Sequence, residues 1–137
     1  GPLRGEAGLC RMGNLSAPLM LPDFIRHVSK ALNCNGIRYA DAGRPVYQVA
    51  VGGGACGDFE SAAIAAGCDT FITSDLNYHQ FLDAAGKGIN LIDAGHFPTE
   101  DPVCRKLVAY LKAQFSQITV HKSASHREVI QYYVEGE

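Results

Sequence analysis

Between residues 46 and 115 the chain alternates between short strand-forming runs and segments with helical patterning. We expect strands over residues 46–51, 69–75 and 89–95, and helices over residues 57–67, 78–88 and 99–115. Strands that are separated by single helices imply right-handed crossover connections and parallel pairing. The alternation therefore predicts an α/β fold, with a mainly parallel mixed sheet and helices on both of its faces.

The flanking segments predict further elements of the same domain. Residues 8–15 read as a strand, residues 21–36 as an amphipathic helix, and residues 36–45 as a short strand and turn. Two more strands are expected over residues 117–121 and 129–134, which are rich in β-branched and aromatic residues.

The longest expected helix, residues 99–115, has an apolar side chain at every fourth position: Val103, Leu107, Leu111 and Phe115. One stripe of this helix is therefore expected to face the sheet. Thr99 is a candidate N-cap, and Glu100 and Asp101 suit the positive end of the helix dipole.

A length of 137 residues fits one domain, which we place over residues 8–137. Gly1, Pro2 and Leu3 resemble the scar of a tag-cleaving protease, so residues 1–7 are expected to be a tag remnant or a flexible start.

Composition excludes several classes of protein. The net charge is −2, no basic run exceeds two residues, and no apolar stretch approaches the length of a membrane span, so neither a nucleic-acid surface nor a membrane segment is expected. The five cysteines are odd in number and contain no C-x-x-C pair, which indicates reduced thiols in a cytoplasmic or nuclear protein. Cys56, in a glycine loop, is the one candidate for a reactive thiol, although an unreactive structural thiol is the favoured interpretation.

Three informative segments follow the expected strands, and the carboxyl ends of parallel strands are where functional groups gather. The first contains Gly52, Gly53 and Gly54. Glycines before a helix can let backbone N–H groups hold a phosphate, but the spacing fits no established nucleotide motif. A tight turn that needs positive φ explains these glycines equally well.

The second segment offers Asp75, which can orient a histidine or accept a proton, and His79, one helical turn further on. The alternative is that Asp75 or Asn77 caps the helix and His79 lies on its flank. His27, His121 and His126 are read as surface or strand-edge residues.

The third segment contains His96 and Glu100, four residues apart, which straddle the expected turn from strand to helix. An imidazole and a carboxylate that converge in this way form half of a site for zinc, manganese or iron. The alternative is that Glu100 compensates the helix dipole while His96 bonds a loop carbonyl.

The motifs GLCRMGNL, VAVGGGACGDFESAAIAAGCDTFITSDLNYHQ and LIDAGHFPTE occur in this order. Together they resemble the C-terminal half of an animal member of the NIF-three-like (NGG-interacting factor) family, whose bacterial members are called type 2 GTP cyclohydrolase I. The resemblance implies a two-lobed α/β protein that forms toroidal homo-oligomers and holds two metal ions between its lobes.

The resemblance also assigns His96 and Glu100 as metal ligands, and places Gly52, Gly53, Gly54, Asp75 and His79 in the same cleft. The family's other ligands, a His-His pair and an acidic residue, belong to an N-terminal half that is not part of these 137 residues. We therefore expect an incomplete metal site that is inactive alone. In the intact protein it would serve a metal-dependent, nucleotide-hydrolysing cleft, with Asp75 or His79 orienting a ligand or carrying a proton.

The alternative function is a non-catalytic module for oligomerisation and for protein partners in transcription regulation. In either case an apolar face, left uncovered where the other lobe would lie, is expected to cause self-association.

Overall fold

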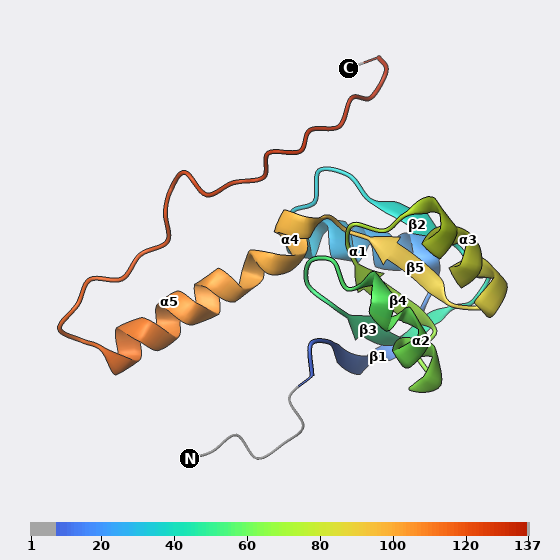
Figure 1. Ribbon diagram of the computed structural model, residues 1–137, viewed down its shortest axis with the longest axis horizontal. Helices are drawn as coiled ribbons and strands as arrows, with labels where there is room; N and C mark the ends of the chain where they lie inside the picture. The colour runs from blue at the N-terminus through green and yellow to red at the C-terminus, as the bar shows by residue number, and fades with distance from the viewer. Residues whose placement is uncertain (1–7, 137) are drawn as a thin grey trace.

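The computed structural model describes residues 8–136 and confirms the predicted α/β fold (Figure 1). Five strands form one sheet in the order β1-β3-β4-β5-β2. They are β1 (Arg11–Leu19), β2 (Arg38–Ala40), β3 (Val46–Val51), β4 (Thr70–Thr73) and β5 (Asn90–Asp93). The central strands β3, β4 and β5 are parallel, as predicted, while β1 and β2 pair antiparallel at the two edges. The expectation for residues 1–7 lies outside the described residues.

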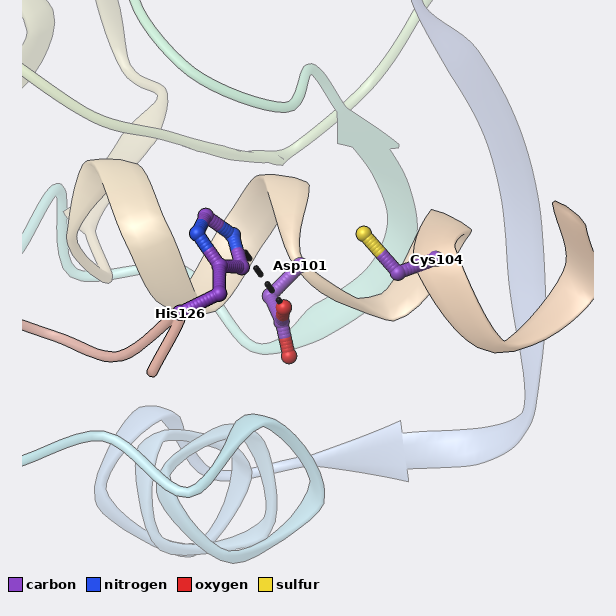
Figure 2. A group of neighbouring side chains, drawn as sticks. All are labelled: Asp101, Cys104 and His126. Atoms are coloured by element: carbon purple, nitrogen blue, oxygen red, sulfur yellow. Dashed lines mark ion pairs between the residues drawn. The ribbon is translucent and has the colours of Figure 1, made fainter. Parts of the chain in front are cut away.

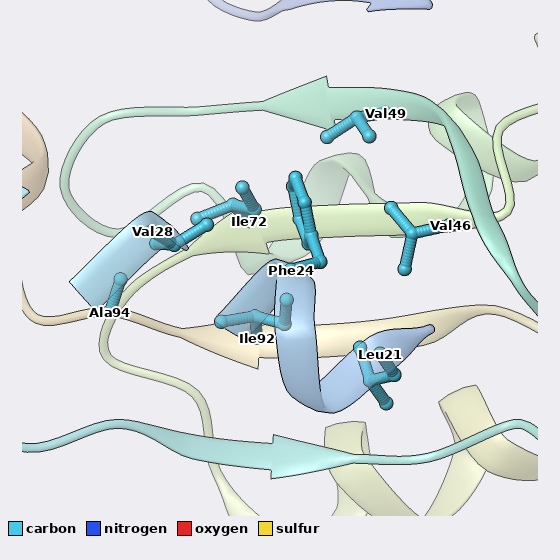
Figure 3. Packing of buried hydrophobic residues seen from close by; sticks show 8 residues of the cluster. All are labelled: Leu21, Phe24, Val28, Val46, Val49, Ile72, Ile92 and Ala94. Atoms are coloured by element: carbon cyan, nitrogen blue, oxygen red, sulfur yellow. The ribbon is translucent and has the colours of Figure 1, made fainter. Parts of the chain in front are cut away.

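Helices cover both faces of the sheet, and the pleat of the strands sorts the core into two clusters. Phe71 and Leu91 point to the face covered by α2 (Glu60–Ala65) and α3 (Tyr78–Lys87), whereas their neighbours Ile72 and Ile92 point to the face covered by α1 (Leu21–Leu32). Figure 3 shows the second cluster, in which Phe24 of α1 packs over the strands. Full burial of each of these side chains contributes about 1.5–3 kcal/mol.

Local signals fix the ends of α3 as the sequence predicts. Asn77 is its N-cap, and its side chain accepts a hydrogen bond from the Gln80 N–H while the Gln80 side chain accepts one from the Asn77 N–H. Gly88 ends the helix in the left-handed conformation. Of the two capping candidates, Asn77 is therefore the cap, and Asp75 is left for another role.

The end of the chain departs from the predictions. The helix expected over residues 99–115 is divided into α4 (His96–Glu100) and α5 (Pro102–Gln114), and α4 begins at His96 rather than beyond it. Gly95, not Thr99, is the N-cap of α4, because its φ of 95° makes the turn out of β5.

The predicted packing of the apolar stripe on the sheet is wrong. α5 projects away from the sheet (Figure 1), and Val103, Leu107 and Phe115 are 53%, 50% and 43% exposed. Apolar side chains do recur at every fourth position of α5, but among the described residues no surface buries them.

The strands predicted over residues 117–121 and 129–134 are also wrong. Among residues 8–136 neither segment joins the sheet: residues 116–118 form a turn and a bend after α5, and residues 129–134 have no regular secondary structure. The segment runs back from the end of α5 toward the end of α1, where Asn35 Nδ2 donates to the Ile130 carbonyl at 2.6 Å.

Within residues 8–136, no helix combines the length and hydrophobicity that a membrane span requires.

A buried carboxylate fastens the start of β4 to the start of β3. Asp69 is 6% exposed and accepts hydrogen bonds from the backbone N–H groups of Tyr47, at 3.1 Å, and Gln48, at 2.8 Å. The Thr70 hydroxyl donates a third bond at 2.7 Å. These bonds align the two strands at the end of the sheet opposite the loops that follow them.

We predict that Asp69→Ala lowers the free energy of unfolding by about 2–4 kcal/mol, because two backbone amides lose a charged acceptor. Urea denaturation measures the change. The matched control is Asp23→Ala, which removes a carboxylate from the exposed pair with Arg26 and should cost less than about 1 kcal/mol. Equal losses in the two variants would contradict this role of Asp69.

Candidate functional site

The three segments after the parallel strands meet at one edge of the sheet, as their sequence order predicts. The Gly52 N–H donates to the Ile72 carbonyl at 2.9 Å, the Ser74 N–H to the Gly54 carbonyl at 3.0 Å, and the Ala94 N–H to the Thr73 carbonyl at 3.0 Å. The backbone ladder thus continues beyond the strands and brings their loops together. Thr73 adds a side-chain link, because its buried hydroxyl donates to the Gly54 carbonyl and accepts from the Cys56 N–H.

His96 lies between two carboxylates at this edge. Its Nδ1 is hydrogen-bonded to Asp75 Oδ2, and its Nε2 lies 3.1 Å from Glu100 Oε2. Asp75 follows β4 in the left-handed conformation, with φ of 55°, and this turn directs its carboxylate toward α4. His96 and Glu100 are the first and last residues of α4, so one helical turn places both on the same face.

Both carboxylates favour the protonated form of His96. The hydrogen bond with Asp75 raises the pKa of His96 most, and the negative charge of Glu100 raises it further, while burial acts in the opposite direction. The three side chains are 46–56% exposed, so water reaches all of them. Because a carboxylate accepts hydrogen bonds, this metal-free arrangement favours the imidazolium form of His96, which donates from both nitrogens.

The geometry of His96 and Glu100 fits two ligands of a single metal ion. Neighbouring ligands of one ion with bonds of about 2.0–2.1 Å lie about 3.0–3.4 Å apart, and Nε2 and Oε2 are separated by 3.1 Å. The carboxylate of Asp75 on the far nitrogen is the usual partner of a metal-bound histidine. Two protein ligands are fewer than the three that an open catalytic zinc site usually has.

The glycine loop accommodates α4 at close range. A Cβ on Gly53 would lie 2.9 Å from the Thr99 carbonyl oxygen, and one on Gly54 would lie 3.0 Å from Glu100 Cδ and 3.3 Å from His96 Cε1. Gly54 also has a φ of 71°, as the tight-turn interpretation requires. Its N–H donates to the Thr99 hydroxyl at 2.9 Å. The loop therefore supports the His96 and Glu100 pair directly, whereas phosphate binding by Gly52, Gly53 and Gly54 stays a prediction.

His79 is not part of this cluster. It lies on α3 with its ring edge-on to Tyr78, 5.7 Å between centroids, and within residues 8–136 it makes no hydrogen bond or ion pair with Asp75 or His96. The histidine that Asp75 contacts is His96.

A second group of metal-ligating side chains was not predicted. Asp101, Cys104 and His126 place one ligand atom each within 4.8 Å of one another (Figure 2). The three-residue spacing of Asp101 and Cys104 on a helix could have been recognised in the sequence. The approach of His126 could not, because it depends on the path of the segment that returns from α5.

His96, Glu100 and the second group line one open groove of about 640 Å³. Its other lining residues include Arg127, Glu128 and the apolar side chains Val103, Val129 and Ile130. The wall opposite α4 and α5 is formed by the returning C-terminal segment. The groove is therefore a mixed surface, with titratable groups near α4 and apolar groups around them.

We predict that His96 titrates above its ordinary pKa of about 6.5 and that Asp75→Asn lowers its pKa, because the neutral amide stabilises the imidazolium less. Asn tolerates the positive φ at this position. Imidazole NMR resonances followed against pH measure the change. A pKa that Asp75→Asn leaves unaltered would contradict the assignment.

The pH dependence of folding stability gives a second measurement on the same variant. The pKa of His96 is higher in the folded state than in the unfolded state, so protonation of His96 stabilises the fold. This stabilisation is fully present below about pH 6.5 and is lost as pH rises through the folded-state pKa. The thermal stability of wild type should therefore exceed that of Asp75→Asn more clearly at pH 5.5 than at pH 8.5.

The chain is similar in sequence to members of one protein family. The family model Duf34/NIF3 (NGG1p interacting factor 3) matches residues 2–128. A GTP cyclohydrolase 1 type 2 homolog of Nostoc sp. is 35% identical over 115 residues, which are 82% of this chain and 44% of the relative. Its namesake from Bacillus subtilis is 36% identical over 108 residues, 76% of this chain and 29% of the relative. The chain thus spans less than half the length of these relatives.

Solved structures agree with the sequences. Staphylococcus aureus protein SA1388 superposes with a TM-score of 0.79 at 27% identity, covering 92% of this chain and 42% of that one. A Bacillus cereus protein related to NIF3 superposes with a TM-score of 0.78 at 28% identity, covering 92% and 36%. Together with the family model, which matches nearly the whole length, these likenesses establish that the chain belongs to the Duf34/NIF3 (NGG1p interacting factor 3) family.

Proposed function

We propose that this chain contributes His96 and Glu100 to a divalent-metal site of a hydrolase that acts on a nucleotide. The observation that supports the proposal is the 3.1 Å separation of His96 Nε2 and Glu100 Oε2, with Asp75 on the opposite nitrogen. When bound, a divalent ion supplies Lewis acidity for the activation of water.

His96, Glu100 and Asp75 would have different roles at the proposed metal site. His96 and Glu100 hold the ion, and Asp75 keeps the imidazole in the orientation and tautomer that present Nε2 to it. The exposed carboxylate of Glu100 also lies where it can accept a proton from water in the groove. Asp75 is a positioning residue in this scheme, since it acts through His96.

The nucleotide is inferred from the relatives, which are named GTP cyclohydrolase 1 type 2 homologs. Because the chain spans less than half of their length, we propose that the remaining metal ligands belong to a second lobe. The chain alone should then bind metal weakly and turn over no nucleotide.

The test is metal-dependent GTP consumption by a two-lobed protein that carries this chain. We predict that Glu100→Gln lowers turnover by at least about a hundredfold, since the metal contributes several kcal/mol to transition-state stabilisation. The matched control is Glu128→Gln, which changes a carboxylate in the same groove and should retain activity. Equal turnover in wild type and Glu100→Gln would refute the catalytic proposal.

The second candidate function is a non-catalytic module for assembly and for protein partners. The exposed stripe on α5 favours it, because Leu107 and Phe115 are 50% and 43% exposed. Apolar side chains at this spacing usually pack against another surface. Homo-oligomerisation through α5 is compatible with either function.

We predict that the chain self-associates and that Leu107→Glu weakens this association at least about tenfold, because burial of a leucine contributes about 1.5–3 kcal/mol. Light scattering over a range of concentrations gives the mass. The control is Ala109→Glu, which adds the same charge on another face of α5. A wild-type chain that stays monomeric at high concentration would contradict the prediction.

A further inference from the structure

The group formed by Asp101, Cys104 and His126 combines three ligand types at one place (Figure 2). Asp101 directly precedes α5 and Cys104 lies one turn later, so a carboxylate and a thiol project from the same face. The imidazole of His126 approaches from the returning C-terminal segment. The three ligand atoms lie within 4.8 Å of one another.

This combination matches the chemistry of zinc. Zinc accepts oxygen, sulfur and nitrogen ligands together, in a tetrahedral site that keeps a fourth position for water. Ligands of such a site lie about 3.3–3.6 Å apart, so closing the group around an ion needs side-chain movements of about 1 Å. Calcium and magnesium prefer oxygen ligands only and fit the group poorly.

Cys104 and His126 make few other interactions, whereas Asp101 is paired with Lys122. Within residues 8–136 the Cys104 thiol makes no hydrogen bond or disulfide. His126 Nε2 lies 3.7 Å from Asp101 Oδ1, too far for a hydrogen bond, and its ring packs on Phe97 with 4.9 Å between centroids. That packing limits the freedom of the imidazole and keeps it beside Asp101.

We propose that Asp101, Cys104 and His126 form a second divalent-metal site, selective for zinc-like ions, which fastens the C-terminal segment to the start of α5. The site shares no side chain with the His96 and Glu100 pair, and it stands whether or not the proposed hydrolase function holds. Its thiolate also distinguishes it chemically from that pair, which offers only nitrogen and oxygen.

The site has a structural consequence for the segment after α5, which contains no helix or strand among the described residues. Near α4 this segment is held by the ion pair of Lys122 with Asp101 and by the contact of His126 with Phe97. An ion bound only in the folded arrangement would stabilise the segment in proportion to the logarithm of its concentration over Kd. The bound metal would thus maintain the groove wall that faces α4.

The positive charge of Lys122 opposes metal binding, so a variant without this charge should bind metal more tightly. Its ammonium group is paired with the carboxylate of Asp101, which is one of the proposed ligands. An ion at the site must displace this ammonium or bind beside its positive charge, and both cost free energy. Removing the charge should therefore tighten metal binding.

The experiment is a titration of the reduced, metal-free chain with Co²⁺, which reports a sulfur ligand through a sulfur-to-cobalt charge-transfer band. We expect the band in wild type, its loss in Cys104→Ser, and its displacement by Zn²⁺. His126→Gln should weaken binding at least about tenfold, and Lys122→Met should strengthen it severalfold.

Two control variants keep the outcome specific. Cys34→Ser changes a thiol that donates to the Ala94 carbonyl, a bond that serine can replace, and it should retain the band. His121→Gln changes an exposed histidine of the same segment and should bind as wild type does. Thermal unfolding of each metal-free variant verifies folding.

Absence of the band in wild type would overturn the proposal. So would its survival in Cys104→Ser, which would assign it to other thiols, such as Cys10 and Cys56, whose sulfur atoms approach one another near Gly52. Equal affinity of His126→Gln and His121→Gln would likewise remove His126 from the site.

Discussion

Parallel pairing of β3, β4 and β5 is the constraint on which the rest of the structure depends. It places the carboxyl ends of three strands at one edge, and the loops after them are joined by further backbone hydrogen bonds from Gly52 to Ile72 and from Ala94 to Thr73. Asp75 and His96 are 21 residues apart in the sequence and meet only because β4 and β5 lie side by side. The candidate metal half-site is therefore a product of the sheet, while α4 supplies only the spacing between His96 and Glu100.

The glycine loop meets a second constraint, which is space. A side chain at Gly53 or Gly54 would collide with α4, at the Thr99 carbonyl and at Glu100 respectively. Residues that look like a phosphate cradle are thus required for the approach of a helix to a loop. The same contact holds Glu100 beside His96, so the geometry of the pair depends on the small size of Gly53 and Gly54.

Sequence patterns predicted the helices and strands that are stabilised by interactions within the element or with elements close in the chain. The β3-α2-β4-α3-β5 order, the Asn77 cap and the gathering of Asp75, His96 and Glu100 at one edge all follow from such patterns. The failures concern segments that need a distant neighbour. Residues 117–121 and 129–134 favour extended backbone, but a strand exists only when another strand accepts its hydrogen bonds. The approach of His126 to Asp101 could not be predicted for the same reason, since no local signal sets the path after α5.

The proposed metal ligands and several exposed apolar side chains occur on a single surface. His96 and Glu100 line the same groove as Val103, Val129 and Ile130, so the proposed metal ligands adjoin exposed apolar side chains. An occupant that buried the apolar residues would be held against α4, with its own polar groups brought beside His96. Apolar contact would then supply most of the binding free energy, and the polar groups would determine the position. Under the proposed function, assembly and metal binding would be two aspects of one interface, since the surface proposed to complete the metal site would also cover these exposed residues.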